Sequence, residues 1–193
     1  MPDLLPQLMM QRDLQDLPAL QRPAGISIRA CGDGDDAAWE AITDDAFERA
    51  PTPGRFHSIM RSSRWFRPER VLFLRDGYRP VATASAWVEE TYGPDAGVLH
   101  YVAVRRASHG RQFGRHVSLA AMHVMAREGH RRVVLRTDDD RIPAIRLYLK
   151  LGFVPFLVHE NQRERWGDVL DDIQRKDLIQ SFAEILNGPV EVA

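Results

Sequence analysis

The fold is decided by residues 98–153, which read VLHYVAVRRASHGRQFGRHVSLAAMHVMAREGHRRVVLRTDDDRIPAIRLYLKLGF. An apolar strand at 98–104 runs into a basic, glycine-bearing turn, and the apolar stripe of a helix that packs on a sheet follows at 113–127. A second strand at 133–135 and a second helix at 141–151 come next. Because a helix that joins two parallel strands points its free N–H groups at one sheet edge, we expect an anionic ligand there.

Further strands and helices are predicted on both sides of this stretch. In chain order they are a strand at Ile26–Cys31, a helix carrying Ala38, Trp39, Ile42 and Phe47, a brief helix at 56–60, hairpin strands at Val71–Leu74 and Val81–Val88, a strand at Val154–Val158, and a helix within 160–177. The hairpin loop, Arg75–Pro80, is longer than the tightest turns. The fold class is therefore α/β, with a mixed, twisted sheet flanked by helices, in which the strands near Val102 and Val133 run parallel.

Length and composition bound the number of domains. The chain has 193 residues, of which 44% are hydrophobic, so we expect a single core. Four prolines interrupt the leucine-rich start, which predicts a short amphipathic arm at 1–24. The domain itself is expected at 25–159, and a helical extension packed on it at 160–193.

Charge and cysteine content exclude several classes of protein. The formal net charge is −1, from 26 basic and 27 acidic residues, so nothing indicates a nucleic-acid or anionic-membrane partner. No window approaches the roughly 18 apolar residues of a membrane span, and the start does not resemble a signal peptide. Cys31 is the only cysteine, which rules out an intramolecular disulfide and suits a reducing compartment. We expect a cytoplasmic protein. A homodimer is compatible with the sequence, which does not fix the oligomeric state.

The turn Arg105–Arg115 has the composition of a phosphate-binding site. Its small residues let the main chain approach a ligand, the following helix offers unpaired N–H groups, and Arg105, Arg106, Arg111 and Arg115 supply positive charge. It has neither the Lys-Ser/Thr ending of a P-loop nor the glycine spacing of a dinucleotide fold. A diphosphate is the natural ligand, and an ordinary basic surface turn is the alternative.

These residues resemble the core of the Gcn5-related N-acetyltransferase (GNAT) superfamily. Its acyl-CoA motif is Gln/Arg-x-x-Gly-x-Gly/Ala after a strand that ends in Val, a position that Val104 takes here. His109, Gln112 and Gly114 occupy the three motif positions, so only the last one matches. The stretch from Ala144 to Phe153 is closer, since it is similar to the family signature Ala-Ile-x-Leu-Tyr-x-Lys-x-Gly-Phe almost position by position.

The resemblance covers roughly Ile26 to Val158 and implies a GNAT-like acyl-CoA acyltransferase fold. It implies an enzyme, an N-acetyltransferase that moves an acetyl group from acetyl-CoA, its cosubstrate, to a primary amine of a small molecule or peptide by direct attack. The alternative is a CoA-binding, degenerate relative with a regulatory or interaction role.

The resemblance also assigns residues to CoA. The main chain at Val102, Ala103 and Val104 would hold the pantetheine arm. The diphosphate would be bound by the main-chain amides of the turn, namely His109, Gly110, Arg111, Gln112, Phe113, Gly114 and Arg115. Two departures from the motif bear on binding: Gln112 puts a side chain where the family has glycine, and His109 is mostly neutral near pH 7.

The resemblance implies that Tyr148 donates a proton to the departing CoA sulfur. Its unperturbed pKa of about 10 keeps the phenol protonated at neutral pH. The alternative is a tyrosine whose ring packs in the core among Ile145, Leu147, Leu149 and Leu151.

A base for the incoming ammonium is less well marked. His100 has the most suitable unperturbed pKa and is the candidate we name. By strand alternation it shares a face with Val102 and Val104, so a buried histidine without a catalytic role is the structural alternative. Glu89, Glu90, Asp138 or a chain of water molecules could serve instead.

A metal site is not expected. His109, His116, His123 and His130 recur every seven residues, but such residues lie about 10.5 Å apart along a helix, too far to share one ion, and are expected on the flank of the helix. The run Asp138–Asp140 precedes a helix, where an N-cap role fits better than cation binding.

Overall fold

The computed structural model describes residues 6–21 and 23–191, which form two compact units. The larger unit comprises Leu14–Val133, and the smaller one comprises residues 6–13 and 134–191 within the described chain. Strands and helices occur in both units, as the predicted α/β class requires. No helix of the described residues is long and apolar enough to cross a membrane.

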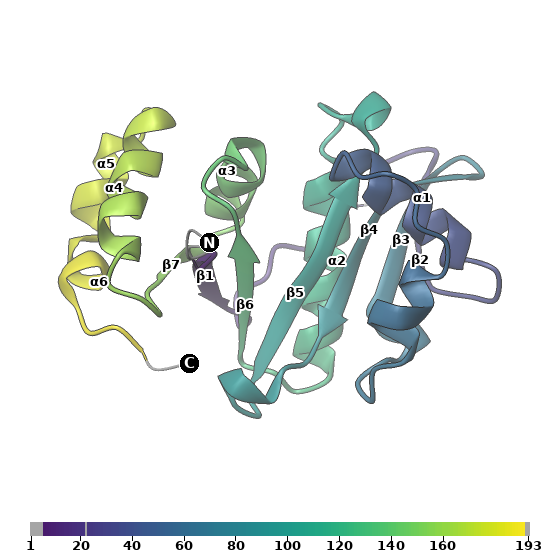
Figure 1. Cartoon of the computed structure of the whole chain (residues 1–193), viewed down its shortest axis with the longest axis horizontal. Helices are drawn as coiled ribbons and strands as arrows, with labels where there is room; N and C mark the ends of the chain where they lie inside the picture. Colours follow the sequence, from purple (N-terminus) through teal and green to yellow (C-terminus); the bar gives the residue numbers. More distant parts are fainter. Residues whose placement is uncertain (1–5, 22, 192–193) are drawn as a thin grey trace. The chain divides into compact units, whose positions relative to one another are not determined.

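The larger unit is built on four antiparallel strands in the order β2-β3-β4-β5 (Figure 1). Their bounds are β2 Ile26–Ala30, β3 Val71–Asp76, β4 Arg79–Trp87 and β5 Ala96–Val104. The hairpin between β3 and β4 is confirmed, but its loop is shorter than predicted, because only Gly77 and Tyr78 separate the strands. Gly77 has a φ of +58°, which a glycine adopts without steric cost.

Two helices cover opposite faces of this sheet (Figure 1). They are α1, Asp36–Ala46, and α2, Phe113–Arg127, and the shorter helical turns of the unit are η1 His57–Arg61, η2 Pro68–Arg70, η3 Glu90–Tyr92 and η4 Arg106–Ser108. On one face, α1 contributes Trp39, whose ring lies 4.8 Å from that of Tyr101 on β5. On the other, Met125 of α2 packs so closely on Gly97 that a β-carbon there would lie 2.7 Å from its sulfur. The apolar stripe predicted at 113–127 is thus confirmed as a packed helix.

Strand β5 changes character at its midpoint. Residues Ala96–Leu99 are buried, but from His100 onward only Ala103 is. Tyr101 has a φ of +47°, and the register places residues 101–102 against the single Ala84, which is a β-bulge. The apolar strand predicted at 98–104 is therefore buried mainly in its first half.

The smaller unit contains strands in the order β6-β1-β7. Its elements are β1 Leu8–Asp13, β6 Arg132–Thr137 from Val134 onward, α3 Ile142–Lys150, β7 Val154–Phe156, α4 Gln162–Asp172, α5 Lys176–Ser181 and α6 Ala183–Asn187. The single helix predicted within 160–177 is interrupted at Gln174, whose φ is +58°. The parallel pairing predicted between strands near Val102 and Val133 stays a prediction.

The start of the chain differs from the predicted arm. Residues 1–5 lie outside the described residues, but Leu8–Asp13 form β1, which pairs antiparallel with β7. Leu8, Met9 and Met10 are buried, because this strand is part of a sheet and does not lie on its surface. The boundaries predicted at 1–24, 25–159 and 160–193 differ from those of the two units, and as domain boundaries they stay a prediction.

The end of α3 has a glycine cap. Gly152 has a φ of +83°, and the N–H of Phe153 donates to the carbonyl of Tyr148 at 3.0 Å. This bond satisfies a carbonyl of the last helical turn, and Phe153 folds back on the helix with its ring 5.8 Å from that of Tyr148.

Candidate functional site

The turn between β5 and α2 is shaped by two residues with positive φ. Gly110 has a φ of +78°, and Gln112, which immediately precedes α2, has a φ of +58° and a ψ of 17°. This is the left-handed region that glycine adopts most easily. Gln112 therefore takes a conformation that suits a glycine, although its residue type departs from the motif.

The main-chain N–H groups from Gly110 to Arg115 face no acceptor within the described chain. The turn is closed upstream by bonds from the amides of Ser108 and His109 to the carbonyls of Arg105 and Arg106, at 2.8 and 3.1 Å. Helix α2 closes its first bond from His116 to Gln112, at 3.1 Å. The amides between these two sets remain available, as expected at a helix N-terminus that binds an anion.

The arginines of the turn differ in their partners. Arg106 pairs with Asp45 and Glu48, and Arg111 pairs with Asp76, so both are compensated by carboxylates of the same unit. Arg105 donates through Nε to the carbonyl of Pro80 at 3.3 Å. Arg115, at the start of α2, has no ion pair in the described part of the chain, and its charge is the one most available to a phosphate.

The side chain of His109 is bound to the end of β5. Its Nε2 lies 3.1 Å from the carbonyl oxygen of Val104, and the residue is exposed. In this position the imidazole links the turn to the strand. Val102 and Val104 are half-buried.

His100 lies on a different face from the one predicted. It is directly opposite Ser85 on β4, while Ala103 is opposite Thr83, so His100 and Ala103 share a face. Val104 pairs with Ala82 and belongs to the other face. The face predicted for His100 by strand alternation is wrong, because the bulge at Tyr101 inserts one extra residue into β5.

Around His100 lie groups that sequence reasoning did not select. Its ring is 4.5 Å from Tyr101 and 6.0 Å from Trp87. The hydroxyl of Ser85 is fully buried and has no hydrogen-bond partner in the described residues. The half-buried imidazole therefore faces a polar group as well as two aromatic rings.

Tyr148 lies on α3 in the smaller unit and is buried. Burial raises the pKa of its hydroxyl to about 12, with a small opposing effect from Arg141. The phenol is thus protonated at neutral pH, as a proton donor must be. Its ring packs on Phe153, so the packing that the structural alternative assumes is also present.

The remaining candidate bases and metal ligands have structural partners. Glu90 pairs with Arg64, and Asp138 accepts a bond from Gln7 at 2.8 Å. Asp139 pairs with Arg165 of α4, and Arg141 precedes α3 without a side-chain cap, so the N-cap role predicted for the aspartates is wrong. No group of three or more potential metal ligands occurs in the described chain.

The histidines at seven-residue spacing do not form one surface. His116 is buried, contrary to the prediction of flank positions. Its pKa is lowered, chiefly by burial and also by the positive charge of the nearby Arg115. His123 is half-buried, and its Nε2 lies 2.9 Å from the carbonyl of Pro18. His130 lies 3.9 Å from Glu128.

Three carboxylates that contact the turn, Asp45, Glu48 and Asp76, were missed by the sequence analysis. Asp45 accepts the main-chain N–H of Arg106 at 2.7 Å. A signal existed for it, because α1 has Asp44 and Asp45 near its C-terminus and no basic residue in its last turn, where the helix dipole disfavours negative charge. A pocket of about 660 Å³ opens beside Asp45 and Glu48, lined by α1, the segment 48–53 and Arg106.

Comparison with known proteins identifies the family. A model of the acetyltransferase (GNAT) family matches residues 37–153. Mycothiol acetyltransferase from Nocardia farcinica is 32% identical over 147 residues, which are 72% of this chain and 48% of that protein. The homologue from Frankia alni is 33% identical over 154 residues, 71% of this chain and 45% of that protein. The chain thus spans about half the length of the curated relatives it matches.

Comparison with solved structures gives the same family. A GCN5-related N-acetyltransferase from Sphaerobacter thermophilus has a TM-score of 0.65 and 29% identity, over 78% of this chain and 49% of that chain. The ribosomal-protein-S18-alanine N-acetyltransferase from Escherichia coli, at 20% identity and a TM-score of 0.54 over 66% of this chain and 76% of that one, shares the fold. Because the family model spans more than half of the 193 residues, the chain belongs to the acetyltransferase (GNAT) family.

Proposed function

We propose that this protein is an acyl-CoA-dependent N-acetyltransferase that transfers an acetyl group from acetyl-CoA to a primary amine of a small molecule. One observation supports this above others: the amides from Gly110 to Arg115 are unpaired in a turn that keeps the glycine conformation at Gln112. A CoA-binding relative without activity is the alternative. The intact turn fits both, so the alternative must be tested on the transfer step.

The turn would bind the diphosphate through these amides, aided by the charge of Arg115. The second half of β5, at Val102, Ala103 and Val104, would hold the pantetheine arm through its main chain. Binding of this kind fixes the thioester, so that an amine attacks an oriented carbonyl carbon.

The transfer needs one proton to leave and one to arrive. The amine nitrogen forms the new bond to the carbonyl carbon and loses a proton, for which His100 is the proposed acceptor. The carbon–sulfur bond breaks, and the CoA thiolate takes a proton from the hydroxyl of Tyr148, which solvent then restores. Both assignments rest on the motif and on the local chemistry of each side chain.

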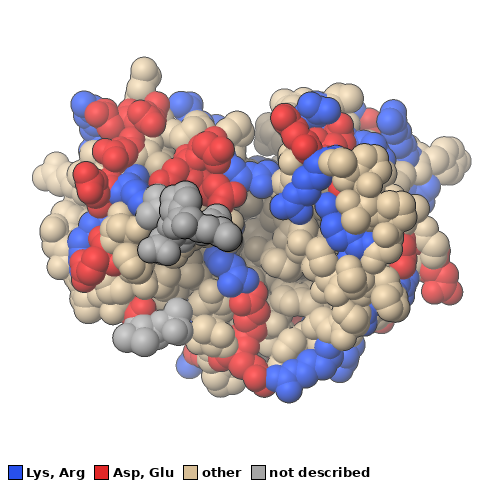
Figure 2. Space-filling model, viewed as in Figure 1, with Lys and Arg blue, Asp and Glu red and all other residues tan. Residues whose placement is uncertain are grey.

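The acceptor class is proposed from the relatives. The curated relatives that match are named mycothiol acetyltransferases, which favours a small-molecule amine over a peptide. On the face shown in Figure 2, basic and acidic side chains are interspersed, which accords with the expectation of no nucleic-acid or membrane partner. Cytoplasmic location and a homodimer stay predictions.

An assay of CoA release tests the activity. Purified protein, acetyl-CoA and a panel of small-molecule amines should release free CoA thiol, with a matching acetylated product in the mass spectrum. CoA alone should raise the melting temperature, because a ligand that prefers the native state stabilises it. Stabilisation without acetyl transfer to any amine of the panel would favour the degenerate relative.

Substitution of Tyr148 by Phe tests the proton donor. Tyr148→Phe removes only the hydroxyl, so turnover should fall about 100-fold, the effect typical of a lost general acid. The dissociation constant for CoA should stay within about twofold, because no bond to the cofactor's phosphates is lost. Turnover equal to that of wild type would remove Tyr148 from the mechanism.

A further inference from the structure

Two arginines of the Arg105–Arg115 turn are held from outside it. Asp45, near the end of α1, accepts the main-chain N–H of Arg106 at 2.7 Å and its Nε at 3.3 Å. Asp76, the last residue of β3, pairs with Arg111, whose guanidinium also lies 4.5 Å from the ring centroid of Phe113. We call the pairs Asp45–Arg106 and Asp76–Arg111 the carboxylate staples.

We infer that the carboxylate staples hold this turn in its diphosphate-binding shape, with Asp45 as the principal positioning residue. The inference rests on the proposed function, because it concerns the same turn and the same ligand. It adds two residues, on α1 and β3, that lie outside the motif and do not touch the cofactor themselves.

The staples hold the turn without using the amides that a phosphate needs. Asp45 binds the N–H of Arg106 and Asp76 binds the side chain of Arg111, so the amides from Gly110 to Arg115 stay unoccupied. A third contact, from His109 to the carbonyl of Val104, lies between the two. These contacts therefore fix the segment while its binding face remains open.

The charge on Asp45 is stabilised mainly by its contact with Arg106. A carboxylate near the C-terminal end of α1 opposes the helix dipole. The main-chain N–H of Arg106, and then its side chain, lower the pKa of Asp45, so the carboxylate is ionised at neutral pH. Negative charge at this position costs α1 stability and is compensated at the turn.

The contacts that Asp45 and Asp76 make with the turn also explain how Gln112 keeps its backbone conformation. A residue other than glycine persists at positive φ when its surroundings determine the course of the chain. A turn that is ordered before the ligand arrives does not lose conformational freedom on binding, and its affinity is higher for that reason.

The experiment compares donors with and without the diphosphate in the full-length protein. For Asp45→Ala, the dissociation constant for CoA by titration calorimetry and the KM for acetyl-CoA should rise about tenfold, the loss of one charge-assisted hydrogen bond. The KM for S-acetylpantetheine, which has the thioester but no diphosphate, should not change. Asp76→Ala should act in the same direction and less strongly, since Asp76 binds only the side chain of Arg111, whereas Asp45 also binds a main-chain N–H.

Two further variants exclude a general loss of stability. Asp45→Asn keeps an oxygen acceptor for the N–H of Arg106, so its affinity for CoA should lie between those of wild type and Asp45→Ala. Glu128→Ala is the matched control, because the side chains of Glu128 and Asp45 are both 30% exposed. Glu128 forms an ion pair with Arg70 and lies just after the C-terminal end of α2, away from the turn. Glu128→Ala should leave the affinity for CoA unchanged.

Three results would overturn the inference. They are unchanged affinity for CoA in Asp45→Ala, an equal rise in the KM for S-acetylpantetheine, and tighter CoA binding in Asp45→Asn, which would show that the carboxylate withholds Arg106 from the phosphate. Each of these leaves the proposed function standing if wild type binds CoA. If wild type itself binds no CoA, the proposed function fails first.

Discussion

Two turns of the larger unit connect a strand to a helix, and they differ in whether their main-chain N–H groups are hydrogen-bonded. Between β2 and α1, the turn Gly32–Asp35 is sealed by its own carboxylate. Between β5 and α2, the turn Arg105–Arg115, which includes the first residues of the helix, leaves the amides of Gly110–Arg115 without acceptors among the described residues. Both lie at the N-terminus of a helix that packs on the same sheet.

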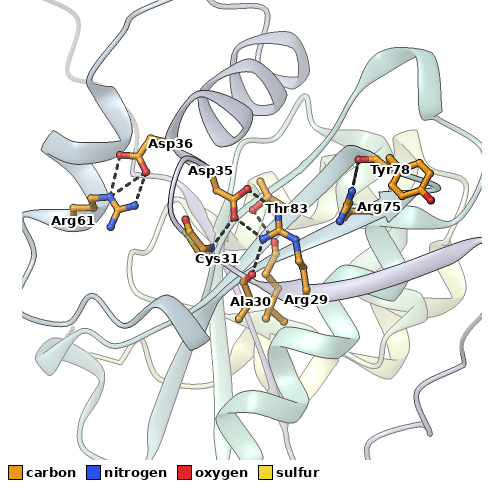
Figure 3. Close-up of polar contacts among 11 residues, drawn as sticks. Arg29, Ala30, Cys31, Asp35, Asp36, Arg61, Arg75, Tyr78 and Thr83 are labelled. Atoms are coloured by element: carbon orange, nitrogen blue, oxygen red, sulfur yellow. Dashed lines mark hydrogen bonds and ion pairs between the residues drawn. The ribbon is translucent and has the colours of Figure 1, made fainter.

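Figure 3 shows the sealed turn. Asp35 accepts two bonds from the guanidinium of Arg29, at 2.5 and 2.7 Å, and one from the main-chain N–H of Gly32 at 2.7 Å. Beside it, Asp36 in the first turn of α1 pairs with Arg61. Cys31 is buried here, and burial raises the pKa of its thiol to about 11, with Asp35 acting in the same direction. The carboxylates of this turn already occupy the place an anionic ligand would take.

The comparison teaches that a helix N-terminus after a strand is not enough for a phosphate site. In the sealed turn, acidic side chains belong to the turn and satisfy it. In the open turn, the carboxylates come from α1 and β3 and hold arginines, so the amides remain free. The origin of the carboxylates distinguishes a structural turn from a binding turn.

The largest expected effect is on CoA binding at the open turn. Arg115→Glu reverses a charge at the start of α2 that forms no ion pair in the described chain, so the dissociation constant for CoA should rise roughly 100-fold. The control is Arg29→Gln, which removes the guanidinium bound to Asp35 of the sealed turn and should leave CoA binding unchanged. Equal losses in the two variants, measured by calorimetry, would remove the distinction between the turns.

The sealed turn should matter for stability instead. For Asp35→Asn, the free energy of unfolding at pH 7 should fall by about 2 kcal/mol, because bonds from a charged donor are weakened. The bonds from Arg29, and then that from Gly32, lower the pKa of Asp35 from its ordinary 3.8. Its contribution is therefore complete above about pH 4 and is lost as the pH falls through the native-state pKa.

Urea unfolding from pH 7 down to pH 2 measures this effect. The curves of wild type and Asp35→Asn should converge at the acid end, and their CoA affinities at pH 7 should agree. Parallel stability curves would show that the carboxylate charge contributes nothing to this turn.

The smallest effect is expected at Gln112. Gln112→Gly removes the steric cost of a β-carbon at a φ of +58° but adds freedom to the unfolded chain, so stability should rise by only about 0.5 kcal/mol. CoA affinity should be unchanged or slightly higher. A loss of stability in urea unfolding would mean that the side chain of Gln112 contributes to the turn.

Local patterns in the sequence were sufficient for much of this fold. The apolar stripe at 113–127 predicted α2, because such a stripe depends on residues a few positions apart. The basic turn was recognised for the same reason.

The features of the fold that could not be predicted from the sequence depend on contacts between residues far apart in the chain. The bulge at Tyr101 is defined by its register against Ala84, so it moved His100 to another face than alternation predicts. Strand β1 exists because β7, near the other end of the chain, pairs with it. The staple residues Asp45 and Asp76 meet the turn only after α1 and β3 have packed.

One measurement addresses the open turn directly, namely a titration of isotope-labelled protein with CoA, followed through its backbone amide resonances. The account predicts that the amides of Gly110–Arg115 shift most and that those of Gly32–Asp35 do not move. Saturable shifts confined to other parts of the chain, or none at millimolar CoA, would contradict it.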